Sequence, residues 1–482
     1  MNPVSGSSPD STDDTLAGAS VARTMRALAH LPHCGHAPIL ADIRFLRDAL
    51  GFSRDVYGRC GPVSRGVLFA RPQVLLMSAQ AIEGVLFDRD GTFSAKAGWG
   101  PLLGRLFPGG LIVRDGEDHR RHRRLMLPAL RREELAKHTA RMAPAIDAAV
   151  DGWIEMHREL KRLTLSLAID VFLGVRLREE IDALHRDLDA IVEAAAAIVR
   201  LPVPGTVWTR GLAARRRAAA FLHTQIAQRR RTPGEDLFSQ LCVQAGGRPD
   251  SPRTDDPESA TARTRSGPAG GFTDQELVDH MIFLLMAAHD TTTSALTTTV
   301  MSLALHPQWQ EHLRDEVRVQ AGSAGRDASQ AADIDQLGRL DLTWQTLREA
   351  LRMYPPIPTI ARATTRAVEL HGQRIPAGTQ VTVFPLLVQR DPQWWTDPDR
   401  FDPERFGPAR AEHKRHPCAW TPFGGGAHMC LGMNFAELQA KIVLRTMLAR
   451  SRWQIAPGYR HDYAFAPIGK PRHGLPITLH RP

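Results

Sequence analysis

The sequence predicts a mainly helical protein in which small β-sheets form a minor part. Stretches such as 133–175 and 182–200 carry apolar residues at helical spacing. Short runs of Val, Leu and Thr bounded by Gly or Pro, at 62–77 and 367–384, predict strands. A further segment, 246–271, is rich in Pro, Gly, Ser and charged residues without periodicity, which predicts a flexible surface loop.

The N-terminal residues and the cysteines bear on location. Residues 1–22 are polar and rich in Ser, Asp and Gly, so we expect a disordered segment with neither a signal peptide nor a membrane anchor. No apolar run reaches the roughly 18 residues that cross a bilayer. The five cysteines are scattered, odd in number and without C-x-x-C spacing, which suits a reducing compartment. These features predict a soluble, cytoplasmic protein.

The charge of the chain does not indicate a nucleic-acid partner. Sixty-one Lys and Arg against 52 Asp and Glu give a net charge of +9, which attracts nucleic acid, anionic lipid or an acidic protein. The basic clusters at 215–217 and 229–231 lie in Ala-rich helical stretches without interleaved aromatic residues. They are typical of a solvated helix face, and we expect no nucleic-acid binding.

One predicted helix combines an apolar centre with polar groups. Thr273 and Glu276 have the spacing of a capping box, and the helix is expected to run to about His306. Its middle, 281–288, is apolar all round, so we expect it to be buried. The polar residues 289–293 follow at once. Threonine bonds to the preceding turn would explain these residues without any chemical role, and on this helix alone that explanation and a functional one are equally favoured.

The segment 423–432 is the most specific feature of the sequence. It places Cys430 after a Gly-rich turn and directly before a helix-like run. Glycines let a backbone fold tightly under a flat cofactor, and a helix N-terminus lowers a thiol pKa. A lone cysteine is more often an inert buried residue. However, Phe423, Gly426, Cys430 and Gly432 follow the pattern F-x-x-G-x-x-x-C-x-G, which resembles the haem-binding signature of the cytochrome P450 family.

A second motif supports that resemblance. Glu349 and Arg352 are three residues apart on one predicted helix face, where they can form an ion pair. The resemblance implies that Arg405, in a Pro-Glu-Arg-Phe segment, completes a buried triad with them. The alternative is a simple surface pair. We expect a structural triad that holds the Cys430 loop and takes no part in the chemistry.

A third motif lies in the long helix. The residues from Ala287 to Thr292 resemble the family's oxygen-activation motif, with the acid at Asp290 and the alcohol at Thr291. The resemblance implies that these two catalytic residues relay protons. Ala288 stands where the family usually has glycine, so the local helix opening is expected to differ.

Four residues resemble partners of the haem propionates. His119 and Arg123 are four apart on one predicted helix face, Arg362 follows a Pro-rich turn, and His428 precedes Cys430 by two residues. Many family members have Trp at the position of His119. Four cationic groups exceed what two carboxylates require, so one or two of these residues are expected to support the others without binding a propionate themselves.

The resemblance covers nearly the whole chain from about residue 40. It implies the family's triangular prism fold, a single domain over 23–482, and haem b (iron protoporphyrin IX) with the iron bound to the Cys430 thiolate. It also implies a monooxygenase that inserts one oxygen atom of O2 into a C–H or C=C bond. Electrons would come from a separate ferredoxin or flavodoxin with its NAD(P)H reductase.

The expected substrate is a hydrophobic small molecule such as a fatty acid, terpenoid or steroid. The segments that line the pocket by resemblance are predominantly apolar and include Phe283, Ala287, Ile357 and Ile360. Two other functions fit the sequence less well. A peroxide-using relative is disfavoured because the acid and alcohol pair is present, and a haem-based sensor or electron carrier is disfavoured because no output domain is visible.

Overall fold

The computed structural model describes most of the chain. Two expected irregular segments fall largely outside the described residues, namely residues 1–21 and 247–270. Ala22 and Gly246, which belong to the expected segments, lie in helices. The described residues are 22–35, 37–135, 155–174, 178–197, 200–201, 203–246, 271–323 and 334–480.

Helices dominate the described chain, as the sequence predicts. The α-helices are α2 (Pro38–Arg47), α3 (Ala49–Cys60), α4 (Ala79–Leu86), α5 (Ala95–Leu103), α6 (Gly116–Met126), α8 (Met156–Leu173), α9 (Arg178–Ala196), α10 (Val207–Arg231), α11 (Leu237–Gly246), α13 (Asp274–Leu305), α14 (Pro307–Ser323), α15 (Ile334–Gly338), α16 (Asp341–Met353), α17 (Pro385–Val388) and α18 (Met433–Arg450). Short 3-10 turns are η1 (Leu111–Val113), η2 (Leu127–Leu130), η4 (Pro403–Phe406), η5 (Glu412–Lys414) and η6 (Gly426–His428). None of the described helices is both long and apolar enough to span a membrane.

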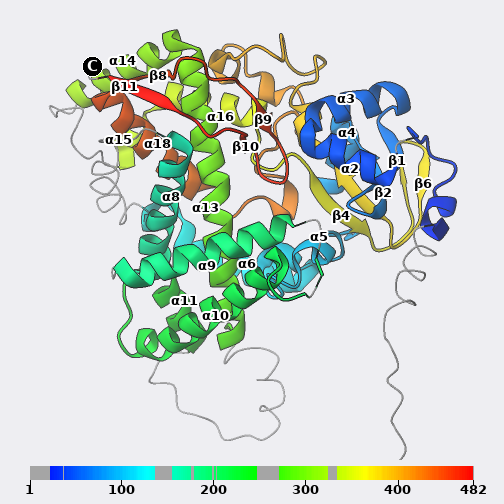
Figure 1. The fold of residues 1–482 in the computed structure, drawn as a ribbon, viewed down its shortest axis with the longest axis horizontal. Helices are drawn as coiled ribbons and strands as arrows, with labels where there is room; N and C mark the ends of the chain where they lie inside the picture. Colours follow the sequence, from blue (N-terminus) through cyan, green and yellow to red (C-terminus); the bar gives the residue numbers. More distant parts are fainter. Residues whose placement is uncertain are drawn as a thin grey trace, which may run out of the picture.

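The strands form one larger sheet and three strand pairs. They are β1 (Val63–Leu68), β2 (Arg71–Leu76), β3 (Phe93–Ser94), β4 (Ile360–Thr364), β5 (Val368–Leu370), β6 (Gln373–Ile375), β7 (Gln380–Val383), β8 (Arg452–Ile455), β9 (Tyr463–Ala464), β10 (Lys470–Pro471) and β11 (Ile477–His480). The larger sheet has the order β1-β2-β7-β4-β3, in which only β2 and β7 pair in parallel. This sheet lies with α2–α4 at one side of the molecule, and the long helices occupy the other (Figure 1).

Helix α13 is the axis of the helical side. The Thr273 hydroxyl accepts from the Glu276 N–H while the Glu276 carboxylate accepts from the Thr273 N–H, so the predicted capping box is present, and His306 caps the other end. Long helices of this side, among them α8, α9 and α10, pack around α13 (Figure 1). Burial along it is uneven, because Phe283 and the residues 286–288 keep accessible surface. The prediction that 281–288 is buried all round is therefore wrong at these positions, which are only partly covered.

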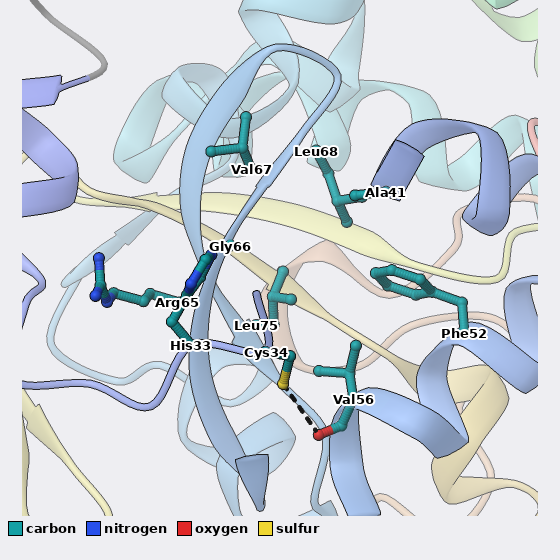
Figure 2. Close-up of a pocket in the computed structure, with 10 residues that line it drawn as sticks. All are labelled: His33, Cys34, Ala41, Phe52, Val56, Arg65, Gly66, Val67, Leu68 and Leu75. Carbon is teal, nitrogen blue, oxygen red and sulfur yellow. Dashed lines mark hydrogen bonds between the residues drawn. The ribbon is translucent and has the colours of Figure 1, made fainter. Parts of the chain in front are cut away.

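Two cysteines are paired, which the sequence did not indicate. A disulfide joins Cys34, before α2, to Cys60 at the end of α3, with Cα atoms 6.1 Å apart. This bond does not fit the inference of a reducing compartment. Beside it lies a cavity of about 20 Å³, enough for about one water molecule. Figure 2 shows its lining, which consists of His33, Cys34, Ala41, Phe52, Val56, Arg65, Gly66, Val67, Leu68 and Leu75.

Candidate active site

The Cys430 loop is a tight turn between Phe423 and α18. The Cys430 N–H donates to the Phe423 carbonyl oxygen at 2.8 Å, which closes the loop on itself. Gly424 and Gly426 have φ angles of 71° and 60°, in the left-handed region that favours glycine. The Gly432 N–H donates to the Cys430 sulfur, and α18 begins one residue later, where the sequence predicts a helix.

The environment of the Cys430 thiol disfavours the free thiolate. Burial raises the pKa of the thiol, and the Gly432 N–H and the Arg123 guanidinium only partly oppose this effect. The expectation that the helix N-terminus lowers the thiol pKa is therefore outweighed by burial. Cys430 nevertheless keeps surface that no protein atom covers. A metal ion that binds the sulfur would displace its proton and remove the cost of burying a thiolate.

The loop is seated directly on the end of α4. A Cβ atom at Gly426 would collide with the Leu86 carbonyl oxygen, and one at Gly425 would lie 3.2 Å from the Phe87 ring. Close approach of two backbones requires glycine at position 426. The loop position is therefore fixed by packing against the sheet side of the molecule as well as by its own hydrogen bond.

The four residues expected to bind propionates are brought together. His119 on α6 stacks on His428, with ring centroids 3.9 Å apart. Arg123, one turn further along α6, donates to the Met429 carbonyl oxygen at 2.7 Å. Arg362 is buried on β4, and its charge acts on both histidines. The cluster thus joins three segments distant in sequence beside Cys430.

Only two members of this cluster carry charge. Burial lowers the pKa of His119 to about 4 and that of His428 to about 3, so both imidazoles are neutral at pH 7. Burial also lowers the pKa of Arg362, to about 10, which leaves this guanidinium and that of Arg123 charged. Neither arginine forms an ion pair with a carboxylate of the described residues. Asp115 and Asp88 act on Arg362 only from beyond ion-pair distance. Two buried or half-buried cations that form no ion pair within the described residues suit a ligand with two carboxylates.

Glu349, Arg352 and Arg405 meet in the interior. The Arg352 guanidinium donates to both Glu349 carboxylate oxygens, at 2.7 and 2.9 Å, and Arg405 donates to one of them at 3.0 Å. All three side chains are fully buried. Arg352 also donates to the Gln389 and Pro398 carbonyl oxygens. The triad therefore holds α16 to the chain segment that leads to the Cys430 loop.

Two further members of this network were missed by sequence reasoning. Glu412 accepts from Arg405 at 3.0 Å and is 1% exposed. The side-chain NH2 of Gln389 donates to the Leu351 and Arg352 carbonyl oxygens, and its side-chain oxygen accepts from the Thr421 N–H. A count of hydrogen-bond donors could have indicated that the network has a further acceptor. Arg405 has five N–H donors, and one shared carboxylate cannot satisfy all of them. No periodicity singled out Glu412 as the second acceptor.

The acid and the alcohol of α13 point to different partners. The Thr291 hydroxyl donates to the Ala287 carbonyl oxygen at 2.7 Å, and the helix is continuous through Ala288. The Asp290 carboxylate lies 3.7 Å from the Lys161 ammonium on α8. His289 donates from Nε2 to the Lys161 carbonyl oxygen at 3.1 Å. Lys161 is a contact that the sequence analysis did not include.

The residues expected to line a substrate pocket share partial accessibility. Phe283, Ala287 and Thr291 recur at four-residue spacing on α13 and all keep accessible surface. The Phe283 ring packs edge-on against Phe107, and Gly110 lies against it so closely that a Cβ there would be 3.0 Å away. Ile357 and Ile360, before and at the start of β4, are also only partly covered. None of these residues is charged, which suits an apolar ligand.

Comparison with known proteins identifies the family. A family model described as Cytochrome P450 matches residues 32–470. The chain belongs to the cytochrome P450 family. Among its relatives is a putative cytochrome P450 136 of Mycobacterium tuberculosis, 35% identical over 94% of this chain and 87% of that one. Another is cyclooctatin synthase of Streptomyces melanosporofaciens, 31% identical over 89% of each chain.

A solved structure shows the same fold. The retinoic acid bound cyanobacterial CYP120A1 covers 92% of this chain and 98% of its own, with a TM-score of 0.79 and 24% identity. The fold is therefore the mainly helical P450 prism with small sheets, as the sequence predicts. Membership of the P450 family also makes the protein an oxidoreductase of the monooxygenase type that uses a haem-iron cofactor.

The residues of this P450 fit that cofactor. Cys430 offers a sulfur with uncovered surface beside a Gly-rich turn, and Arg123 and Arg362 offer two guanidinium groups without carboxylate partners in the described structure. A thiolate suits iron, and paired guanidinium groups suit two propionates. The donor set is therefore consistent with an iron porphyrin that Cys430, Arg123 and Arg362 would hold.

Proposed function

We propose that this P450 binds haem b through Cys430 and inserts one oxygen atom of O2 into a hydrophobic small molecule, by hydroxylation or epoxidation. The observation that carries the proposal is the Cys430 loop, closed by its own hydrogen bond and flanked by two cations that lack carboxylate partners in the described chain. Thiolate-ligated haem supplies the oxygen activation that such insertion needs.

The protein's own residues bind, orient and deliver protons. Cys430 holds the metal, and the Gly432 N–H tunes how strongly the sulfur donates. Arg123 and Arg362 pair with the two carboxylates, while neutral His119 and His428 act as hydrogen-bonding and stacking partners. Thr291 and Asp290 move protons toward the reacting oxygen through water, because neighbouring side chains on a helix do not face each other and these two have different partners. Phe423, Gly426 and the Glu349, Arg352 and Arg405 triad keep the loop in place.

The substrate is expected to be apolar. Phe283, Ala287, Ile357 and Ile360 present no charge, and the structural neighbour was solved with retinoic acid bound. Fatty acids, terpenoids and steroids fit such a surface. Retinoic acid is the natural first probe for a binding screen.

Electrons are expected from a separate ferredoxin or flavodoxin with its NAD(P)H reductase. An acidic carrier complements the net charge of +9. We propose that the enzyme works in the cytoplasm, where NAD(P)H is available to such a reductase. The Cys34–Cys60 disulfide is the observation that opposes this proposal.

A labelling experiment tests this function. A compound that shifts the haem absorption band is incubated with the purified enzyme, NADPH, ferredoxin and ferredoxin reductase under labelled O2. The product should carry one labelled oxygen atom, and the Cys430→Ala variant should lose both the product and the red-shifted carbon monoxide band typical of thiolate ligation. The proposal is wrong if product forms only with added peroxide, or if the variant keeps the band.

A further inference from the structure

The disulfide between Cys34 and Cys60 is a reactive group that the proposed oxygen insertion does not use. Both residues are only partly covered by the rest of the protein. The remaining cysteines do not compete with them for an outside reagent, since Cys242 and Cys418 are fully buried and Cys430 is the proposed iron ligand. Chemistry at this pair can therefore be separated from chemistry at the haem.

The surface around Cys60 is open to solvent. Cys60 is the last residue of α3, and the three residues before it are exposed. A Cβ atom at Gly58 or at Gly61 would meet no other atom within 4 Å. Because no other segment covers either glycine, a small thiol can approach Cys60 from this side.

Cys34 presents its sulfur to the interior. Its Sγ lies 3.6 Å from the Val56 carbonyl oxygen of α3 (Figure 2). The sulfur of a disulfide has no hydrogen to donate, whereas a thiol can donate to this oxygen. The cavity of about 20 Å³ described above is lined by Cys34 and not by Cys60. The Cys34 sulfur therefore has both room to withdraw and a hydrogen-bond acceptor once the bond to Cys60 is broken.

Other contacts hold this part of the chain when the disulfide is open. The Arg65 guanidinium on β1 donates to the Met25 and Leu31 carbonyl oxygens, at 3.1 Å each. Arg59 on α3 donates to the Cys34 carbonyl oxygen at 2.9 Å. The Leu31 side chain is buried in the core beside the larger sheet. Reduction therefore removes a covalent link and leaves these contacts in place.

We propose that Cys34 and Cys60 are a reversible redox site for a small thiol such as glutathione, and that the exchange takes place at Cys60. The thiolate of the reductant bonds to the Cys60 sulfur, and the S–S bond breaks with its electron pair on Cys34. Cys34 takes up the proton that the reductant lost and donates it to the Val56 carbonyl oxygen. A second thiol attacks the mixed disulfide, which leaves two protein thiols and one disulfide of the reductant.

The redox state of this pair sets the local stability of α2 and α3. Both helices lie between Cys34 and Cys60, which are 26 positions apart, and a disulfide restricts the open states of the span that it closes. Arg54 of α3 donates to both Asp399 carboxylate oxygens at 2.9 Å, so α3 is also bonded to the chain between α17 and η4. A reversible bond agrees with the proposed cytoplasmic location, where lasting disulfides are rare.

The first test asks whether the bond opens and closes in the folded enzyme. Haem-loaded, full-length protein is treated with reduced and then with oxidised glutathione, without denaturant, and free thiols are counted by alkylation and mass spectrometry. Two thiols should appear and then disappear, while the carbon monoxide band of the Cys430 haem stays unchanged. The proposal is overturned if the bond resists reduction until urea unfolds the chain, if it does not form again, or if the band is lost on reduction.

The second test uses two matched variants to locate the exchange. Cys34→Ser leaves Cys60 as a free thiol, and Cys60→Ser leaves Cys34. With oxidised glutathione, the Cys34→Ser protein should form its mixed disulfide about tenfold faster, because Cys60 is open and Cys34 faces inward. The modified residue is identified by mass in the tryptic peptides Ala27–Arg44 and Cys60–Arg65. Equal rates, or a faster reaction at Cys34, would contradict exchange at Cys60.

The third test addresses the effect on α2 and α3. Hydrogen exchange is compared for the oxidised wild type, the reduced wild type and the Cys34→Ser protein. Amides of α2 and α3 should exchange about tenfold faster in the last two than in the first, and this increase should exceed that of α18, which the bond does not enclose. An equal increase in all three helices, or no increase, would overturn the inferred local effect of the redox state.

Discussion

At the scale of single residues, Glu349 has the largest expected effect on stability. Its carboxylate accepts from both Arg352 and Arg405, and all three side chains are fully buried. Glu349→Gln leaves two buried guanidinium groups without this counter-charge. We expect the free energy of unfolding, measured with urea, to fall by about 3–5 kcal/mol.

A surface counterpart provides the control for Glu349. Glu117 also bridges two arginines, Arg120 at 2.9 Å and Arg124 at 3.0 Å, but all three side chains are more than half exposed. Glu117→Gln should leave the unfolding curve unchanged, because water replaces the lost partner. Equal losses in the two variants would contradict the view that burial makes the triad important.

How far single residues could be predicted depended on whether their partners were local. The Glu349 and Arg352 pair follows from helical spacing, and Cys430 follows from its glycines. The stack of His119 on His428 joins residues 309 positions apart, and nothing in either segment encodes the other. The neutrality of both rings arises from burial, which a sequence pattern does not report.

At the scale of elements, the contact between α6 and α13 is sensitive to acid. His122 Nδ1 and His280 Nε2 are 2.7 Å apart, and both residues are fully buried. Burial holds the pKa of His280 well below its ordinary value of 6.5, so the folded protein keeps this imidazole neutral. The unfolded chain binds a proton there below pH 6.5, so stability is full above that pH and declines as the pH falls.

The slope of stability against pH tests this contact. His280→Gln removes one group that only the unfolded chain protonates. As the pH falls from 7, the free energy of unfolding should decrease less steeply for the variant than for the wild type. The two slopes should differ by up to about 1.4 kcal/mol per pH unit. Parallel curves for the two proteins would show that His280 is not kept neutral by the fold.

The Cys34–Cys60 disulfide, which links the segment before α2 to the end of α3, gives a second prediction at this scale. Cys34→Ser should lower the free energy of unfolding by about 2–4 kcal/mol, since the bond closes a loop of 26 residues in the unfolded chain. The carbon monoxide band should persist, because Cys430 is untouched. Thiol counting supplies the check: the unfolded, unreduced protein should show three free thiols and the reduced protein five.

Helices were predicted well where a short sequence motif marks their ends. The limits of α13 match to within a residue because the capping box is a four-residue signal. The order of the strands in the larger sheet could not be predicted from the sequence. Its central parallel pair, β2 and β7, joins Gln73 to Gln380, and short strands with alternating residues carry no information on which distant strand they meet.

At the scale of the whole molecule, the docking of an electron carrier can be placed more narrowly than the sequence allowed. Three arginines of α6, namely Arg120, Arg121 and Arg124, are candidates for the docking surface. Arg121 is only 24% exposed and donates to the Gly271 carbonyl oxygen, so it is not available. Arg120 and Arg124 are 61% and 72% exposed on α6, the helix that contacts the Cys430 loop through Arg123.

Charge reversal of these two arginines tests the docking surface. Arg120→Glu with Arg124→Glu should slow reduction by an acidic ferredoxin at low ionic strength and flatten the dependence on salt, since screening acts beyond about 10 Å at 0.1 M. Haem content should not change. Arg374→Glu, on β6 at the right edge of Figure 1, should keep the wild-type profile. If the profiles of the double variant and the wild type coincide, the carrier docks elsewhere.

The contact of Gly426 with the end of α4 limits how this enzyme can be engineered. A library that samples every residue at each position, selected only for folded protein, should reject all replacements of Gly426, because any Cβ meets the Leu86 carbonyl oxygen. Gly432, in the same ten-residue signature, has no neighbouring atom within 4 Å of where a Cβ would lie, and it should accept alanine under that selection. Only selection for folded protein alone would distinguish the two glycines. Gly426 is required by the close approach of two backbones, and Gly432 is required by the group that Cys430 holds.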